Sequence, residues 1–246
     1  MTDFKFMPKP RHVDIAITGR CNLNCAYCFY ADEMVALHDL PTQVWLDLFK
    51  RLGELGVMGV TLTGGEAFTR PDFFDLVDGV IANHMRYDIL SNGTLITEKT
   101  LKEFEKGKRR LRLDSIQISI DGSCPEVHDH SRPNSFNRAL RGLTLLKAGG
   151  FPLTVRVTIN RFNYNDLENV AYLLLNEVGL PGFSTNEAYP CGATNRFEEG
   201  IMLSVDQRRE VMNTLTRLNE KYDGRISATA GPLALAGQER VIKEAQ

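Results

Sequence analysis

Three cysteines stand within eight residues near the start of the chain, in the stretch CNLNCAYC from Cys21 to Cys28. Thiolates at such short spacing are ligands for zinc or for an iron-sulfur cluster. A structural zinc site usually takes a second Cys or His pair downstream, and none follows here. Four cysteines complete an ordinary iron-sulfur site, so Cys21, Cys25 and Cys28 are expected to hold a 4Fe-4S cluster and to leave one iron open to a cofactor. Zinc, or plain packing of buried cysteines, is the alternative.

Polar residues also follow the apolar segments further along the chain. Gly64, Gly65 and Glu66 come directly after the apolar run 59–63, and two glycines at a strand end let the backbone approach a ligand closely. Alone, this triplet is more often a turn. Ser91 begins a Ser-Asn-Gly triplet that ends another apolar run, and its spacing alone also indicates a turn.

The spacing C-x₃-C-x₂-C, followed by an aromatic residue, resembles the signature of the radical S-adenosylmethionine (SAM) superfamily. The resemblance covers residues 12–230. It implies that the amino and carboxylate groups of SAM complete the 4Fe-4S cluster, and that Ala67 stands where the family commonly has Pro. The residues that it places around SAM are Tyr27, Gly64, Gly65, Glu66, Ser91, Ser119 and Arg132, and Arg156 is expected to point into the same barrel and to bind either SAM or substrate.

Two of these residues belong to a longer pattern. Ser119 opens the sequence Ser-Ile-Asp-Gly, and Arg132 follows the run His-Asp-His at 128–130, which is expected to be a loop. The pattern resembles peptide- and protein-modifying radical SAM enzymes of the SPASM or twitch type, in which such a Ser and Arg hydrogen-bond SAM. A guanidinium suits a carboxylate. The His-Asp-His run is not expected to bind metal, because neighbours in a loop rarely point to one centre.

The resemblance also implies an activity. One electron cleaves SAM to methionine and a 5′-deoxyadenosyl radical, which takes a hydrogen atom from a peptide or protein substrate. The expected partners are that substrate and an electron donor such as flavodoxin or ferredoxin. Cys191 is a candidate for taking part in the reaction, although a free Cys is commonly a small buried hydrophobe. The alternatives are small-molecule cofactor biosynthesis, resembling the molybdopterin-precursor enzyme, and a non-catalytic iron-sulfur or zinc scaffold.

Strand and helix patterns alternate along the chain and must position these residues. The expected strands are 12–18, 59–63, 87–91, 115–120, 153–159 and 182–187. Such alternation predicts an α/β fold, an open partial (β/α)₆ TIM-like barrel. Its active site would lie at the carboxyl ends of the strands, where the motifs fall. A last helix is expected over 203–222 and a strand leading out of the barrel over 225–230.

Composition sets the remaining limits. The chain has 246 residues, 43% hydrophobic and 24% charged, as expected for one barrel-sized domain over residues 1–230. A net charge of −2 favours neither nucleic acid nor membrane as a partner. The chain contains no apolar run of transmembrane length and no signal peptide, so we expect it in the cytoplasm. Residues 231–246 contain no Cys and are expected to begin a truncated C-terminal extension, because this group usually continues into a domain with auxiliary clusters; an enzyme without auxiliary clusters is the alternative.

Overall fold

The computed structural model describes residues 9–36, 38–196, 200–228 and 234. Within them, seven parallel strands form one open sheet whose order follows the sequence. The strands are β1 (His12–Ala16), β2 (Gly59–Thr63), β3 (Arg86–Ser91), β4 (Leu113–Ser119), β5 (Leu153–Ile159), β6 (Phe183–Glu187) and β7 (Ile226–Ala228). The predicted open α/β barrel is confirmed. The strand expected last pairs with β6 as β7, and residues 229 and 230 lie outside the described range.

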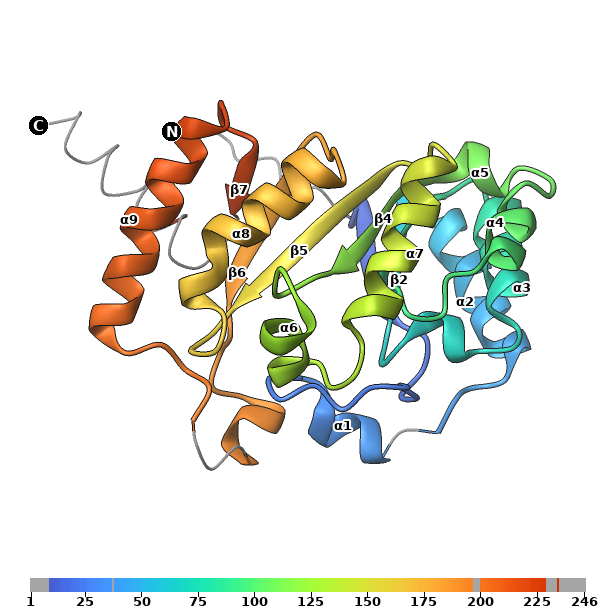
Figure 1. Ribbon diagram of the computed structural model, residues 1–246. Coiled ribbons are helices and arrows are strands. Elements are labelled where there is room, and N and C mark those ends of the chain that lie inside the picture. The colour runs from blue at the N-terminus through green and yellow to red at the C-terminus, as the bar shows by residue number, and fades with distance from the viewer. Residues whose placement is uncertain (1–8, 37, 197–199, 229–233, 235–246) are drawn as a thin grey trace, which may run out of the picture.

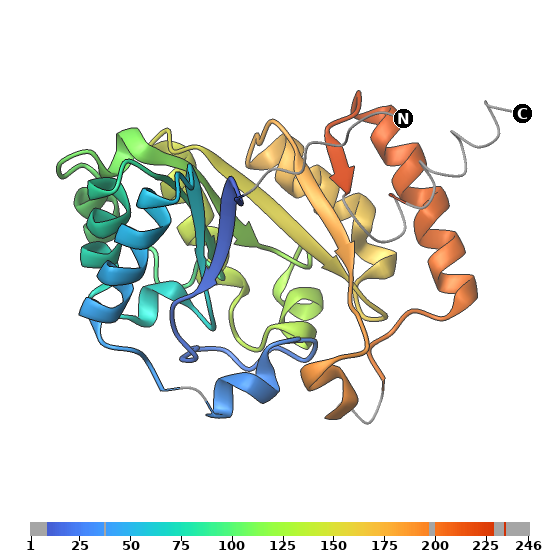
Figure 2. The ribbon, with the colours of Figure 1, turned by 180° about the vertical axis from the view of Figure 1, so that it is seen from behind.

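Helices connect the strands and cover one face of the sheet (Figure 1). The view from behind shows the opposite face of the sheet, which is largely free of helices (Figure 2). The helices are α1 (Ala31–Ala36), α2 (Thr42–Glu54), α3 (Phe73–Ala82), α4 (Glu98–Phe104), α5 (Arg109–Arg112), α6 (Pro125–Ser131), α7 (Phe136–Ala148), α8 (Leu167–Tyr172) and α9 (Val205–Lys221). No helix in this part of the chain is long and apolar enough to span a membrane.

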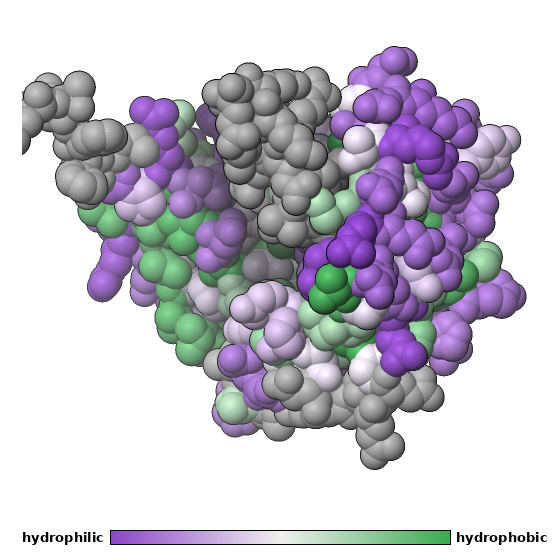
Figure 3. Space-filling view, turned by 90° about the vertical axis from the view of Figure 1, so that its left-hand side faces the viewer, coloured by the Kyte–Doolittle hydropathy of each residue, from purple (hydrophilic) through white to green (hydrophobic). Residues whose placement is uncertain are grey.

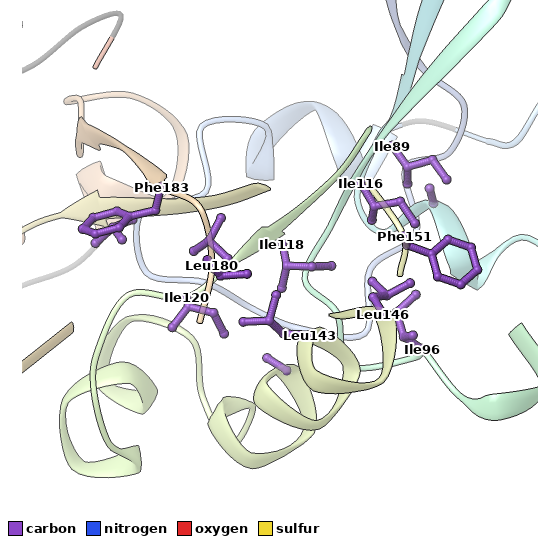
Figure 4. Close-up of a cluster of buried hydrophobic side chains, with 14 of the residues drawn as sticks. Ile89, Ile96, Ile116, Ile118, Ile120, Leu143, Leu146, Phe151, Leu180 and Phe183 are labelled. Atoms are coloured by element: carbon purple, nitrogen blue, oxygen red, sulfur yellow. The ribbon is translucent and has the colours of Figure 1, made fainter. Parts of the chain in front are cut away.

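Side chains along each strand point alternately to the two faces of the sheet, so that one face forms the hydrophobic core and the other faces the site. In β4, Ile116 and Ile118 are buried on the helix-covered face, where Figure 4 shows them near Leu143 and Leu146 of α7. Successive strand residues point to opposite faces, so the residues between them face the other way. The inner faces of ordinary TIM barrels are filled with branched apolar residues. Here the inner face is polar.

The last helix shows how local signals and packing combine. Ser204 caps α9, and its Oγ accepts a hydrogen bond from the backbone N of Gln207 at 3.2 Å. The helix buries Val211, Leu215 and Leu218 against the core. Figure 3 shows the molecule from the side of α9, with hydrophilic and hydrophobic residues mixed on its surface.

One predicted loop is a helix. The run His-Asp-His lies in α6, which begins with Pro125 after Cys124. Pro is favourable at the first position of a helix because it lacks the N–H that would have no partner there. The expectation of a loop at 128–130 was therefore wrong.

Candidate active site

A cavity of about 440 Å³ opens at the carboxyl ends of the strands, within the size range of small-molecule sites. The three cysteines Cys21, Cys25 and Cys28 line it together. The other predicted residues that line it are Tyr27, Gly64, Gly65, Ser91, Ser119, Arg132, Arg156 and Cys191. Of the residues predicted for the site, only Glu66 does not line this cavity. The structure thus brings together side chains that are up to 170 positions apart in the sequence, from Cys21 to Cys191.

The cysteine loop is held by backbone hydrogen bonds to two distant segments. The N–H of Ala26 donates to the carbonyl of Ser131 at 2.9 Å, at the end of α6. The N–H of Ala193, after β6, donates to the carbonyl of Cys28 at 2.9 Å. All three cysteines of the loop are free and partly buried, and burial raises the pKa of each thiol. The loop is therefore positioned by the fold and not only by its own sequence.

Glu66 lies behind the cavity wall and joins two loops. Its carboxylate accepts hydrogen bonds from Ser91 Oγ at 2.9 Å and from the backbone N of Asn92 at 2.7 Å. Burial raises the pKa of this carboxyl group, and the hydrogen bonds oppose that rise. The backbone of Gly64 and Gly65, by contrast, faces the cavity. The predicted contact of Glu66 with the amino group of SAM stays a prediction.

The cysteine motif at residues 21–28 is also linked to the loop after β3, through side-chain amides. Asn92 Nδ2 donates to Asn22 Oδ1 at 2.9 Å, and Asn22 Nδ2 donates to Thr94 Oγ1 at 2.8 Å. Asn22 lies directly after the first cysteine of the motif. The loop after β3 therefore helps to orient the cysteines.

Asp121 connects the cysteine motif with Arg132. Its side chain is 0% exposed, and its Oδ2 accepts hydrogen bonds from Arg132 Nε at 2.6 Å and from the Tyr27 hydroxyl. Its Oδ1 accepts from the backbone N of Thr158 on β5 at 2.7 Å. Arg132 also lies over the ring of Tyr27, 5.2 Å from its centre, with Nη1 3.7 Å from Cys25 Sγ. Arg132 thus already has a buried counter-charge in the protein.

The polar residues of α6 support this network and do not form a metal site. His128 is fully buried, with Nδ1 accepting from the backbone N of Asp121 at 3.1 Å and Nε2 3.0 Å from Ser135 Oγ. Asp129 accepts from the backbone N of Ser135 at 2.9 Å, before α7. His130 stacks on Phe162 instead. His128 and Asp129 thus both contact Ser135, through its side chain and its backbone respectively, whereas His130 lies against Phe162.

Two polar atoms on the inner face of the sheet are buried without a partner. Arg156 Nε on β5 and Asn186 Oδ1 on β6 form no hydrogen bond with any described residue, and both residues line the cavity. Buried polar atoms are nearly always paired. Unpaired atoms in a cavity wall indicate that a ligand supplies the partner.

The residues present fit a cluster and SAM. The three thiols are soft ligands of the kind that iron-sulfur clusters take, and they line one cavity with the unpaired polar atoms. Within the described ranges, no three His, Cys, Asp or Glu side chains converge closely enough to hold a single metal ion. A 4Fe-4S cluster instead takes one thiolate on each of three separate irons. Fold and site together define a parallel α/β barrel with an iron-sulfur cysteine motif at its carboxyl edge.

Comparison with known proteins agrees with this class. The family model described as the Radical SAM superfamily matches residues 15–174, and the chain belongs to that family. The enzymes of the family use a 4Fe-4S cluster and SAM, and solved structures with this fold include SAM complexes. The family resemblance and both predicted cofactors are therefore confirmed.

Individual relatives are longer than this chain. An AdoMet-dependent heme synthase of Methanosarcina barkeri is 26% identical over 91% of the chain and 62% of the relative. A PqqA peptide cyclase of Ruegeria pomeroyi is 31% identical over 69% of the chain and 45% of the relative. The structure of Streptococcus suis SuiB bound to precursor peptide SuiA matches 94% of the chain and 51% of SuiB, with a TM-score of 0.75 at 16% identity. The chain thus spans about half the length of these relatives.

Sequence reasoning missed two residues of the site. Asp121 was part of the Ser-Ile-Asp-Gly pattern and was assigned no role, although an Asp directly after a strand that ends at the site is a signal. Asn186 was placed in the last predicted strand of the barrel without a function. Its signal is the alternation Phe-Ser-Thr-Asn-Glu, which puts Asn186 on the opposite face from the buried Phe183.

Proposed function

We propose that this chain is the barrel of a radical SAM enzyme that modifies a peptide or protein, with Cys21, Cys25 and Cys28 as the cluster ligands. The observation that carries the proposal is that these thiols share one cavity with the polar ends of β2 to β6. When bound, the cluster and SAM supply a 5′-deoxyadenosyl radical that takes a hydrogen atom from the substrate.

The protein's own residues orient the cofactor and exclude water. We propose that the backbone at Gly64 and Gly65 meets the amino group of SAM with Glu66, whose side chain also holds the neighbouring loop. Ser119 and Arg132 are proposed to meet the carboxylate. Asp121 keeps the Arg132 guanidinium in place through the 2.6 Å hydrogen bond, so little rotational freedom is lost when SAM binds.

The remaining contacts lie around the nucleoside. Tyr27 is proposed to lie against adenine and Ser91 near the ribose. Burial raises the pKa of Tyr27 well above its usual value, so its hydroxyl stays protonated and donates to Asp121. Enclosure by the barrel keeps water and stray hydrogen donors from a reactive radical.

A peptide or protein is the preferred substrate because relatives over the matched segment include a PqqA peptide cyclase, and because the fold is shared with a SuiB structure that holds a precursor peptide. An external donor such as flavodoxin or ferredoxin would supply the electron, and the cytoplasm is the proposed location. Modification of a small molecule is the second candidate. It is favoured by the heme synthase, which matches more of the chain than the cyclase does.

The test is anaerobic reconstitution with iron and sulfide, followed by dithionite and SAM. We expect wild type to turn brown and to release 5′-deoxyadenosine, whereas Cys25→Ala should do neither because one iron loses its ligand. Cys124→Ala is the matched control, since Cys124 is also a free, partly buried thiol but does not line the cavity. A Cys25→Ala protein that keeps its colour and cleaves SAM would contradict the cluster assignment.

A further inference from the structure

Arg156 is a charged group of the cavity with no counter-charge. It lies in the middle of β5, opposite Ser119 of β4 and Ser184 of β6 in the strand register. Its Nε is buried and unpaired, and among the described residues its guanidinium forms no hydrogen bond or ion pair. Its side chain lines the cavity. A buried Nε–H without a partner is costly unless a ligand supplies an acceptor, and the positive charge of the guanidinium favours an anionic one.

The other charges of the cavity are already matched. Arg132 is paired with Asp121, and Glu187, which also lines the cavity, is paired with Arg208 at 2.5 Å. Among the charged side chains of the described residues that line the cavity, Arg156 is therefore the one without an ionic partner.

Asn186 supplies a second unpaired atom on the neighbouring strand. Asn186 pairs with Thr158 of β5 in the strand register, and Thr158 lies two residues after Arg156 on that strand. The Asn186 Oδ1 is buried and accepts no hydrogen bond from the part of the chain that the structure describes. An amide oxygen calls for an N–H donor. The pair thus calls for a ligand with a carboxylate and an N–H a short distance apart.

We infer that Arg156 and Asn186 form a subsite that binds a carboxylate and a neighbouring N–H of the substrate, as offered by an acidic residue or the C-terminal residue of a peptide. The inference rests on the proposed function. The carboxylate in this cavity has two possible sources, the substrate and the methionyl group of SAM. The substrate is favoured because Ser119 and Arg132 already provide a hydroxyl and a guanidinium for SAM.

Four variants test the proposed subsite by changing the charge of Arg156, the shape of its head group, the amide of Asn186 and, as a control, a distant arginine. Arg156→Met removes the charge at similar length, and Arg156→Lys keeps the charge without the planar fork. Asn186→Leu removes the amide. Arg209→Met is the control, because Arg209 lies on the exposed side of α9 with a side chain 70% exposed.

Two small probes replace the unidentified substrate: N-acetylglutamate N-methylamide and its neutral glutamine analogue. Binding is measured by saturation-transfer NMR on the full chain. We expect Arg156→Met to weaken the glutamate probe about tenfold and to leave the glutamine probe unchanged, with Arg156→Lys in between. Asn186→Leu should weaken both probes equally, because both offer the same N–H. Equal binding of the two probes to wild type would overturn the inference.

A second measurement identifies the source of the carboxylate. Equilibrium dialysis of SAM with the reconstituted protein should give dissociation constants within about twofold of wild type for Arg156→Met, the scatter expected when no contact is lost. A tenfold loss of SAM affinity with unchanged probe binding would assign Arg156 to SAM and overturn the inference.

Thermal unfolding of the cofactor-free protein tests whether Arg156 is only structural. Because Arg156 has no hydrogen bond or ion pair to other described residues, Arg156→Met should not lower the melting temperature, whereas loss of a structural contact would lower it by several degrees and contradict the inference. Neither this measurement nor the probe titration needs the cluster. Failure of wild type to release 5′-deoxyadenosine would therefore count against the proposed function alone.

Discussion

The carboxylate of Asp121 is the point at which the cysteine loop, the end of α6 and β5 are joined by hydrogen bonds. The Asp121 and Arg132 side chains are 0% and 12% exposed. Removing one partner of a buried pair leaves the other charge without compensation, which costs more than the pair itself contributes. Asp121 is therefore expected to be a positioning residue for the site.

Asp121→Asn should lower the free energy of unfolding by about 3–5 kcal/mol, because Arg132 stays buried without its counter-charge. Urea unfolding followed by circular dichroism measures the change. Asp114→Asn is the control, since Asp114 forms an exposed ion pair with Arg86 and should lose no more than about 1 kcal/mol. Equal losses in the two variants would contradict the role assigned to Asp121.

His128 should make stability depend on pH. Burial lowers its pKa to about 4, below the ordinary 6.5, so the folded protein holds the neutral ring. The free energy of unfolding that the neutral His128 ring contributes is fully present above about pH 6.5 and is lost as the pH falls through about 4. Its size is about 3 kcal/mol, from 1.36 kcal/mol per pKa unit.

His128→Asn should therefore flatten the fall in unfolding free energy between pH 6.5 and 4, measured by urea unfolding across that range. The control is His84→Asn, because His84 is exposed and has a φ of 64°, a conformation that Asn tolerates. If wild type and His128→Asn lose stability with the same pH dependence, another group is responsible.

At the scale of elements, the loops after β1 and β2 touch through their backbones. The N–H of Gly65 donates to the carbonyl of Thr18 at 2.9 Å, and the N–H of Glu66 donates to that of Arg20 at 2.8 Å. A Cβ at position 65 would lie 2.2 Å from the Arg20 carbonyl oxygen and 3.0 Å from Cys21 Cβ. The cysteine loop can lie where it does only because residue 65 has no side chain.

Gly65→Ala should therefore displace the cysteine loop, reduce the iron bound on reconstitution and lower the free energy of unfolding by roughly 3 kcal/mol. Iron and sulfide analysis together with urea unfolding measure both effects. Gly107→Ala is the control, because its φ of 57° strains alanine while no atom lies within 4 Å of the added Cβ. It should cost about 1–2 kcal/mol and leave iron binding unchanged. Normal iron content in Gly65→Ala would contradict the steric argument.

The predicted elements differ in how well the sequence indicated them. Helices such as α7 and α9 carry a long apolar period and were predicted, as were all six core strands. The short helices α1, α5 and α6 were missed. Helices of four to seven residues are not stable by themselves and form through tertiary contacts, such as the backbone bond between Ala26 and the last residue of α6.

At the scale of the molecule, the predicted ligand groups other than Arg156 lie at the carboxyl edge of the parallel sheet, because every strand runs in the same direction. Cluster and SAM binding should therefore protect that edge from hydrogen exchange and leave the opposite edge unchanged. The segments expected to be protected are 19–30, 64–66, 91–94 and 187–194. The segments expected to be unchanged are 56–58, 107–112, 149–152 and 179–182. Mass spectrometry of peptides from cofactor-free and loaded protein measures this, and uniform protection would contradict a site confined to one edge.

The sequence by itself predicted the three cysteines as cluster ligands, and it indicated the strand order of the barrel and the edge at which the cavity lies. Those properties follow from local spacing and from the parallel direction of βα units. The tertiary structure alone decided that Glu66 turns behind the wall, that Asp121 holds Arg132, and that Arg156 and Asn186 are left without partners. The reason is that a side chain's partner depends on which distant segments fold against it. Residues as far apart as 121 and 27, or 66 and 92, meet only once the sheet has formed.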